Sequence, residues 1–241
     1  MIAADGAEHA LLPDILSHQA CGSAQRILVQ PGADLNCEQA IYFPIDAIAS
    51  VSLARRETAF QVGFAARGDA IGIQSLFMPD SPPLHARVLK GGTLISVAPD
   101  LLRRLMKEDA KLKDRLSNYA MRALARYLDS AVCAATLSIE RRVAQWISRY
   151  GGVLRNTSLP VTHQQMASAL GVRRSGVTVA LHVLEGEHLV RSKRARIEIL
   201  DPAGLMSFCA GDSPPANGLG GPVPVGSRDA SRSSEKALST V

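Results

Sequence analysis

One segment, residues 162–190, limits the possible folds of this chain more than any other. Its sequence, THQQMASALGVRRSGVTVALHVLEGEHLV, places apolar residues at intervals of three and four on both sides of Gly171. Such spacing gives each of two short helices one apolar face. Glycine suits a left-handed turn between helices because it has no Cβ. The segment therefore predicts two crossing helices, HQQMASAL and a second from about Arg173 to Glu185. The apolar positions that such helices would bury are Met166, Ala167, Leu170, Val172, Val177, Leu181 and Leu184.

The flanking sequence extends this pattern in both directions. Thr162 has the spacing to Gln165 that is typical of a capping box. Upstream, Ser138 is a plausible N-cap for a helix IERRVAQWISRY that should end at Gly151-Gly152. Downstream, LVRSKRARIEILD predicts two short strands around a basic turn. Helix, helix, glycine turn, helix and basic hairpin together predict a winged helix-turn-helix.

Charge is distributed unevenly along the chain, whose formal net charge is +5. Residues 138–200 hold nine arginines and one lysine against four glutamates, an excess of six positive charges, so the remainder is nearly neutral. A basic domain joined to a neutral one predicts a polyanionic partner for the first. The same composition argues against a base-stacking RNA-binding sheet, because aromatic residues are only 4% of the chain.

The region before residue 99 predicts a different architecture. RILVQPG, AIYFPIDAIASVSLA, TAFQVGFAARGDAIG and LHARVLKGGTLISVA are short strand-like runs separated by Gly and Pro, as in sandwiches and small barrels. From Asp100 to about Ala135 there is neither Gly nor Pro, and the apolar spacing predicts one long amphipathic helix. That helix could pack on its own barrel, but its length and polar faces favour a dimerisation seam. The predicted seam residues are Leu105, Leu112, Leu116, Tyr119, Ala123 and Tyr127.

Taken together, these patterns resemble those of the Crp/Fnr transcription regulators. The helix-turn-helix and wing resemble their DNA-binding domain, YFPIDAIASVS resembles part of their β-roll, and the long helix resembles their dimer helix. The resemblance extends from about Leu12 to Leu205 and implies an α+β fold. It divides the chain into a β-roll, a double-stranded jelly-roll-like barrel, at 1–99, a dimerisation helix at 100–136 and a winged helix-turn-helix at 137–210. Composition predicts a disordered tail at 211–241.

The resemblance implies a cytoplasmic homodimer that binds a palindromic DNA operator and works with RNA polymerase. Arg174 falls on an arginine that reads guanine in family members, whereas Ser175 and Val179 stand where Glu and a second Arg are common. A different half-site preference is therefore expected. Thr162 and His163 are expected at backbone phosphate, as are three wing cations, whereas Arg141 and Arg142 are expected to be solvated. The complete predicted DNA-binding set is Thr162, His163, Arg173, Arg174, Ser175, Thr178, His182, Lys193, Arg194 and Arg196.

The resemblance also bears on the effector. Members that bind cyclic AMP use a Glu and an Arg-Ser pair in the β-roll, and these positions fall on Ile73, Leu84 and His85 here. Arg87 is displaced by about 7 Å along a strand, and Tyr127 and Leu128 replace small hydroxyl residues. A buried phosphate without a cation is strongly disfavoured. The expectation is operator binding without cyclic AMP, with activity set by abundance, an unidentified small ligand or cysteine oxidation.

No metal, cofactor or catalytic residue is expected. The cysteines at 21, 37, 133 and 209 are scattered, as reduced cytosolic thiols are, and Cys21 with Cys37 cannot supply the four ligands of an iron–sulfur cluster. A redox role for Cys133 stays open. A cupin-like metal enzyme remains the alternative from another class, but its barrel offers only His85 with unpatterned carboxylates at 46, 57 and 69. The first residues lack a basic, apolar leader, and no run is long enough for a membrane helix.

Overall fold

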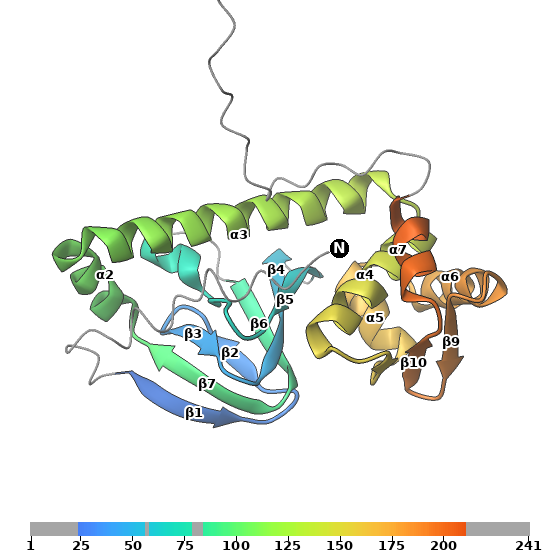
Figure 1. The fold of residues 1–241 in the computed structure, drawn as a ribbon, viewed down its shortest axis with the longest axis horizontal. Coiled ribbons are helices and arrows are strands. Elements are labelled where there is room, and N and C mark those ends of the chain that lie inside the picture. The colour runs from blue at the N-terminus through green and yellow to red at the C-terminus, as the bar shows by residue number, and fades with distance from the viewer. Residues whose placement is uncertain (1–23, 56–57, 79–83, 211–241) are drawn as a thin grey trace, which may run out of the picture.

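The computed structural model describes residues 24–55, 58–78 and 84–210 (Figure 1). A roll of antiparallel strands occupies one end, a winged-helix domain occupies the other, and a long helix runs along both. This mixed architecture confirms the predicted α+β class. The predicted tail at 211–241 lies outside the described residues. None of the described helices is both long and apolar enough to cross a membrane.

The roll consists of two antiparallel sheets. One has the order β1 (Gln25–Val29), β7 (Gly92–Val97), β3 (Ile41–Pro44), and the other has the order β2 (Asp34–Asn36), β6 (Leu84–Lys90), β4 (Ile48–Arg55), β5 (Thr58–Ala65). A short 3-10 turn, η2 (Ile73–Leu76), follows β5. Strand β6 shows why the sheets curl around a core: Leu84, Ala86 and Val88 alternate inward as buried residues, while His85 and Arg87 are exposed.

The predicted long helix is wrong in one respect, because the chain makes two helices there. Helix α2 (Pro99–Glu108) ends at Asp109, which has extended backbone angles, and α3 (Ala110–Thr136) starts immediately after it. The Asp109 carboxylate accepts hydrogen bonds from the backbone N–H groups of Lys111 and Leu112, at 2.8 and 3.1 Å. An aspartate N-cap therefore interrupts a segment that contains no Gly or Pro.

The predicted dimerisation residues are also corrected, because the chain buries most of them in its own core. Leu105, Leu112, Leu116, Tyr119 and Ala123 are at most 5% exposed and pack under the roll, and Tyr127 is half-buried against the same core. The Tyr119 hydroxyl donates to Asp69 Oδ1 at 3.0 Å and accepts from the Ala70 N–H at 2.8 Å. This face of α3 holds the roll, so it cannot meet a second chain.

Another face of α3 carries apolar side chains that have no cover in the described chain. Met121, Leu124, Leu128 and Val132 are 63%, 47%, 58% and 59% exposed. Their spacing of three, four and four residues places them on one side of the helix. We call these four residues the α3 stripe.

The C-terminal domain starts at α4 (Ile139–Leu154), which Ser138 caps by accepting from the Arg141 N–H. The predicted end at Gly151-Gly152 is wrong, because α4 continues to Leu154 and ends at Arg155 in a left-handed conformation, φ 51°. Glycine at 151 allows close packing instead: a Cβ there would lie 2.7 Å from Ile199 Cδ1.

The predicted helix pair and hairpin follow α4. They are α5 (His163–Leu170), α6 (Arg174–Gly186), β9 (Val190–Lys193) and β10 (Arg196–Ile199). Two elements were not predicted: β8 (Ser158–Leu159), which pairs with β10, and α7 (Pro202–Ala210), which packs on α4. Leu205 of α7 is fully buried in the domain core.

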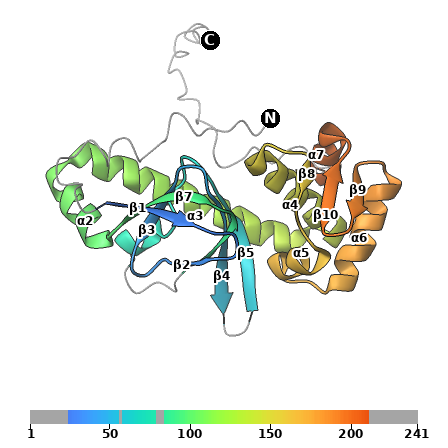
Figure 2. The ribbon, with the colours of Figure 1, turned by 90° about the horizontal axis from the view of Figure 1, so that it is seen from below.

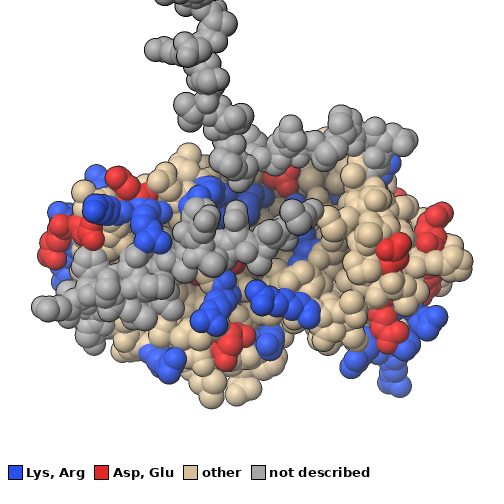
Figure 3. All heavy atoms as spheres, in the orientation of Figure 1, with Lys and Arg blue, Asp and Glu red and all other residues tan. Residues whose placement is uncertain are grey.

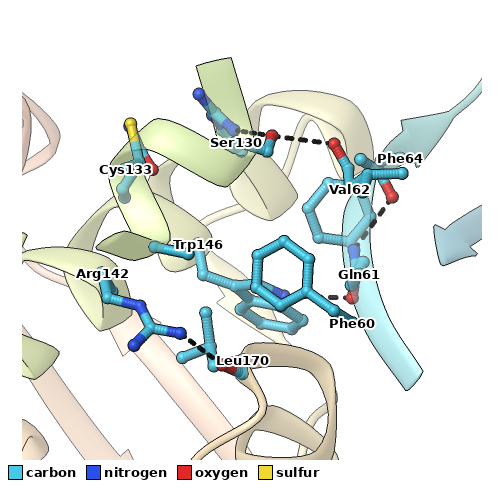
Figure 4. A pocket seen from close by; sticks show the side chains of 13 residues that line it. Phe60, Gln61, Val62, Phe64, Ser130, Cys133, Arg142, Trp146 and Leu170 are labelled. Carbon is cyan, nitrogen blue, oxygen red and sulfur yellow. Dashed lines mark hydrogen bonds between the residues drawn. The ribbon is translucent and has the colours of Figure 1, made fainter. Parts of the chain in front are cut away.

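The roll and the C-terminal domain meet where β5 lies beside α4 and α5 (Figure 2). Phe64 packs edge-on against Trp146, whose Nε1–H donates to Gln61 Oε1 at 3.2 Å. Figure 4 shows these side chains around a small pocket, whose volume of about 40 Å³ has room for a few water molecules but not for a nucleotide. Arg142, predicted to be solvated, is half-buried here and donates to the Leu170 carbonyl; burial lowers its pKa.

Candidate nucleic-acid interface

The entry to α5 is fixed by reciprocal hydrogen bonds. The Gln165 N–H donates to Thr162 Oγ1 at 3.1 Å, and the Thr162 N–H donates to Gln165 Oε1 at 2.8 Å. The predicted capping box is therefore confirmed. At the other end of α5, Gly171 has φ 63°, as predicted for the left-handed turn. These two local features set the position of α6 against α5.

Helix α6 has one buried and one outward face. Val177, Ala180, Leu181 and Leu184 are at most 1% exposed and join the domain core. The predicted outward residues lie as expected: Arg173, Arg174, Ser175 and His182 are exposed, and Thr178 is half-buried. Val179, which the resemblance matches to a base-reading position, is 57% exposed, and Val183, which no pattern predicted to lie outward, is 40% exposed. The outward face thus presents cations, hydroxyls and two bare apolar side chains.

His163 links three elements instead of standing free. Its Nδ1 lies 3.1 Å from Thr178 Oγ1 on α6, and its Nε2 lies 3.0 Å from Ser192 Oγ on β9. Since the Thr178 hydroxyl donates to the Arg174 carbonyl at 3.2 Å, it accepts from Nδ1–H, and Nε2 then accepts from Ser192. Burial, and next the Arg174 guanidinium, lower the pKa of His163. A neutral ring fits both contacts, so His163 holds α5, α6 and the hairpin together.

The β9–β10 hairpin presents a basic face. Its register pairs Lys193 with Arg196 and Arg191 with Glu198, and cross-strand partners share one side of a sheet. All but the half-buried Glu198 are exposed, so this side carries three cations and one carboxylate. Figure 3 shows Lys and Arg side chains gathered at the lower right, near this hairpin. Arg191 was missed, although its two-residue spacing to Lys193 in a strand could have placed it on the same face.

The cations of the hairpin differ in whether they already have a partner within the chain. Lys193 Nζ lies 2.7 Å from Glu198 Oε1, and this hydrogen bond lowers the pKa of Glu198. Arg196 donates to Ser158 Oγ at 2.9 Å. Arg194 is exposed at the tip beside Ala195, whose φ is 54°. His182, on α6, keeps 73% of its side chain exposed with Nδ1 3.3 Å from Glu185.

The residues of the roll give little support to the alternative of a cupin-like metal enzyme. His85 is exposed on β6, and Asp69 accepts from Tyr119 and from the Ala66 N–H. Asp46 accepts from the Thr93 N–H, and Glu57 lies outside the described residues. Within the described ranges, no three His, Cys, Asp or Glu side chains come together as metal ligands would.

The positions matched to a nucleotide site do not all face the same way. Ile73 and Leu84 are buried and apolar, whereas His85 and Arg87 are exposed on the opposite face of β6. Arg87 Nη1 lies 3.9 Å from Asp34 at the surface. Tyr127 packs between both cores of the roll, and burial raises its pKa to about 12.

Comparison with known proteins gives a consistent result. Residues 141–208 match the model of the Crp-like helix-turn-helix domain. A Crp/Fnr family regulator from Eubacterium rectale has a TM-score of 0.64 at 17% identity, over 83% of this chain and 93% of that one. A second, from Thermus thermophilus, has 0.64 at 18% identity, over 78% and 99%.

A third similar structure is the c-di-GMP-responsive global regulator CLP of Xanthomonas campestris, with a TM-score of 0.65 at 16% identity, over 79% of this chain and 98% of that one. No curated protein matches the sequence. The C-terminal part of this chain is thus a Crp-like helix-turn-helix domain, and the described chain has the fold of Crp/Fnr family transcriptional regulators.

Proposed function

We propose that this protein is a homodimeric, sequence-specific DNA-binding transcription regulator that recognises a palindromic operator in the cytoplasm and acts on RNA polymerase. The observation that supports this most is the outward face of α6 beside the basic hairpin. Arg173 and Arg174 stand exposed at the start of α6. The N-terminal residues of such a helix face base edges when it lies in a major groove.

The hairpin supports a model in which α6 reads the base sequence and the hairpin adds affinity. Arg191 and Arg194 are exposed and carry positive charge beside the recognition helix, where duplex phosphates would pass. Phosphate contacts add affinity and salt dependence without reading sequence. Lys193 is a weaker candidate than the sequence suggested, since it is paired with Glu198. His163 acts by positioning Thr178, because both its ring nitrogens are engaged within the chain.

The α3 stripe supports the dimer. Four exposed apolar side chains along one side of a 27-residue helix form a surface that a second copy of the same helix would cover. A two-fold axis along this seam would present two copies of α6 to successive major grooves, about 34 Å apart. A palindromic operator follows from that symmetry.

The roll supports operator binding without cyclic AMP. The residues that face inward from β6 are apolar, and the nearby cation Arg87 faces outward. A cyclic phosphate placed among Leu84, Ala86 and Val88 would have no cationic partner on that strand. Gating by an unidentified ligand or by cysteine oxidation remains an alternative. Burial raises the pKa of both Cys37 and Cys209 to about 11, which makes them poor nucleophiles, whereas Cys133 lines the pocket between the domains.

The test is selection of bound duplexes from a random pool by the purified chain. Enrichment of an inverted repeat with half-site centres one helical turn apart is expected, whereas a single unrepeated site would contradict the dimer model. Calorimetric titration of the same protein with cyclic AMP should show no binding. Micromolar binding that tightens operator affinity would overturn that part of the proposal.

A further inference from the structure

We propose that Val179 reads the C5-methyl group of a thymine in each operator half-site; this rests on the proposed function. Val179 is 57% exposed on the outward face of α6, and Val183, one turn later, is 40% exposed. Both residues therefore keep apolar surface open to solvent. An apolar side chain on the face proposed to enter the major groove can contact an apolar group there, and Val179 is nearer than Val183 to the N-terminal end of α6, the end that faces base edges.

The surroundings identify that ligand as duplex DNA rather than a protein. The two valines share their face with Arg174, Ser175 and His182, and the basic hairpin lies beside them through the His163 contacts. A polyanion fits these cations. The thymine methyl group is the apolar group that a DNA major groove offers to a side chain.

Geometry sets the position of the thymine relative to the base read by Arg174. Val179 follows Arg174 by five residues, which is about 7.5 Å along a helix. Successive base pairs are about 3.4 Å apart, so the two side chains reach base pairs about two steps apart. An arginine reading guanine and a valine reading thymine would together specify two positions of each half-site.

The specificity assigned to Val179 depends on one methyl group, so it can be tested by removing that group. Uracil pairs as thymine does but lacks the methyl. In the selected operator, replacing the contacted thymine by uracil in one half-site should weaken binding about fourfold. Replacing it in both half-sites should weaken binding about sixteenfold. Val179→Ala should bind the thymine and uracil operators equally. Val183→Ala is the matched control and should retain the preference.

Three results would overturn this assignment. They are a selected half-site without thymine near the Arg174-dependent position, uracil operators that bind as well as thymine operators, and full methyl preference in Val179→Ala. Each of these leaves the proposed function standing if an operator was selected. Failure to select any sequence would overturn the proposed function and the thymine contact with it. Unchanged thermal melts of both variants would show that the fold is intact.

Discussion

Replacing Leu128 by glutamate should convert the proposed dimer to monomers while leaving each chain folded. Leu128 is 58% exposed in the middle of the α3 stripe and contributes nothing essential to the core of its own chain. Substitutions at such exposed positions usually change the free energy of unfolding by no more than about 0.5 kcal/mol. Leu116, on the side of α3 that packs against the roll, is fully buried, so Leu116→Ala should cost about 2–5 kcal/mol of folding stability instead.

The size of the effect on the dimer follows from exposure. A leucine that is about half exposed contributes about 1 kcal/mol to the free energy of association when a partner covers it. The substitution removes this contribution twice, because a homodimer contains Leu128 twice. Two carboxylates in an apolar seam add an unfavourable desolvation of about 1–3 kcal/mol each. The sum, about 4–8 kcal/mol, corresponds to a dimer dissociation constant about a thousandfold or more weaker. Operator binding should fall with it, because each monomer reaches only one half-site.

Sedimentation equilibrium over a concentration series measures this constant directly, since the chain mass is 25.6 kDa. Leu28→Glu provides the matched control: it makes the same chemical change at a 76% exposed leucine on β1, away from α3. The control should keep the dimer mass and the operator affinity of the unmodified protein. The reasoning fails if Leu128→Glu sediments as a dimer, or if the unmodified chain is a monomer throughout.

Three further sets of substitutions test the interface and the contact between domains. Arg174→Ala should weaken operator binding by about 1–3 kcal/mol and relax the sequence preference at one base pair per half-site. Arg194→Ala should weaken binding to operator and random duplex alike and flatten the dependence of affinity on salt. Anisotropy titrations at several salt concentrations measure both, and an equal loss of affinity for operator and random duplex in Arg174→Ala would contradict base reading. The lowered pKa of His163 means that the unfolded chain takes up a proton first as the pH falls below the usual value of 6.5, so stability is full above that pH and decreases below it. His163→Gln should reduce this decrease in paired melts without DNA, and an unchanged slope would exclude the neutral link. Trp146→Phe removes the donor to Gln61 and should cost about 1 kcal/mol, with Gln61→Leu less than additive in the double variant; strict additivity would contradict a direct contact.

The C-terminal domain was predictable because its signals are local. Thr162 with Gln165, Ser138 and Gly171 act through hydrogen bonds and backbone angles within a few residues, and all three predictions are confirmed. The apparent stop at Gly151-Gly152 failed because Gly151 serves a distant contact with Ile199 of β10. Helix α7 was missed because its stability comes from packing on α4 rather than from a strong periodic pattern of its own.

The candidate interface was predictable in part for the same reason. Helical periodicity separates the outward from the inward positions of α6, so Arg174 and Ser175 were placed correctly. Which polar groups are already used inside the domain depends on tertiary contacts: His163 with Ser192, Lys193 with Glu198 and Arg142 with Leu170. Formal charge alone cannot distinguish a free cation from one that already has a partner.

The predicted dimerisation residues show where periodicity itself is insufficient. Helix α3 has two apolar faces, one through Leu112, Leu116, Tyr119 and Ala123, the other through the α3 stripe. A hydrophobic pattern says that a face needs cover, but it does not say whether the cover is the same chain or another. The stronger apolar pattern predicts a dimer face, but in the structure these residues pack against the roll of the same chain. When a helix supports a domain on one side, a row of exposed apolar residues on another side favours contact with a second partner. The α3 stripe is therefore the face to mutate, since a loss of dimerisation can be detected there without unfolding the protein.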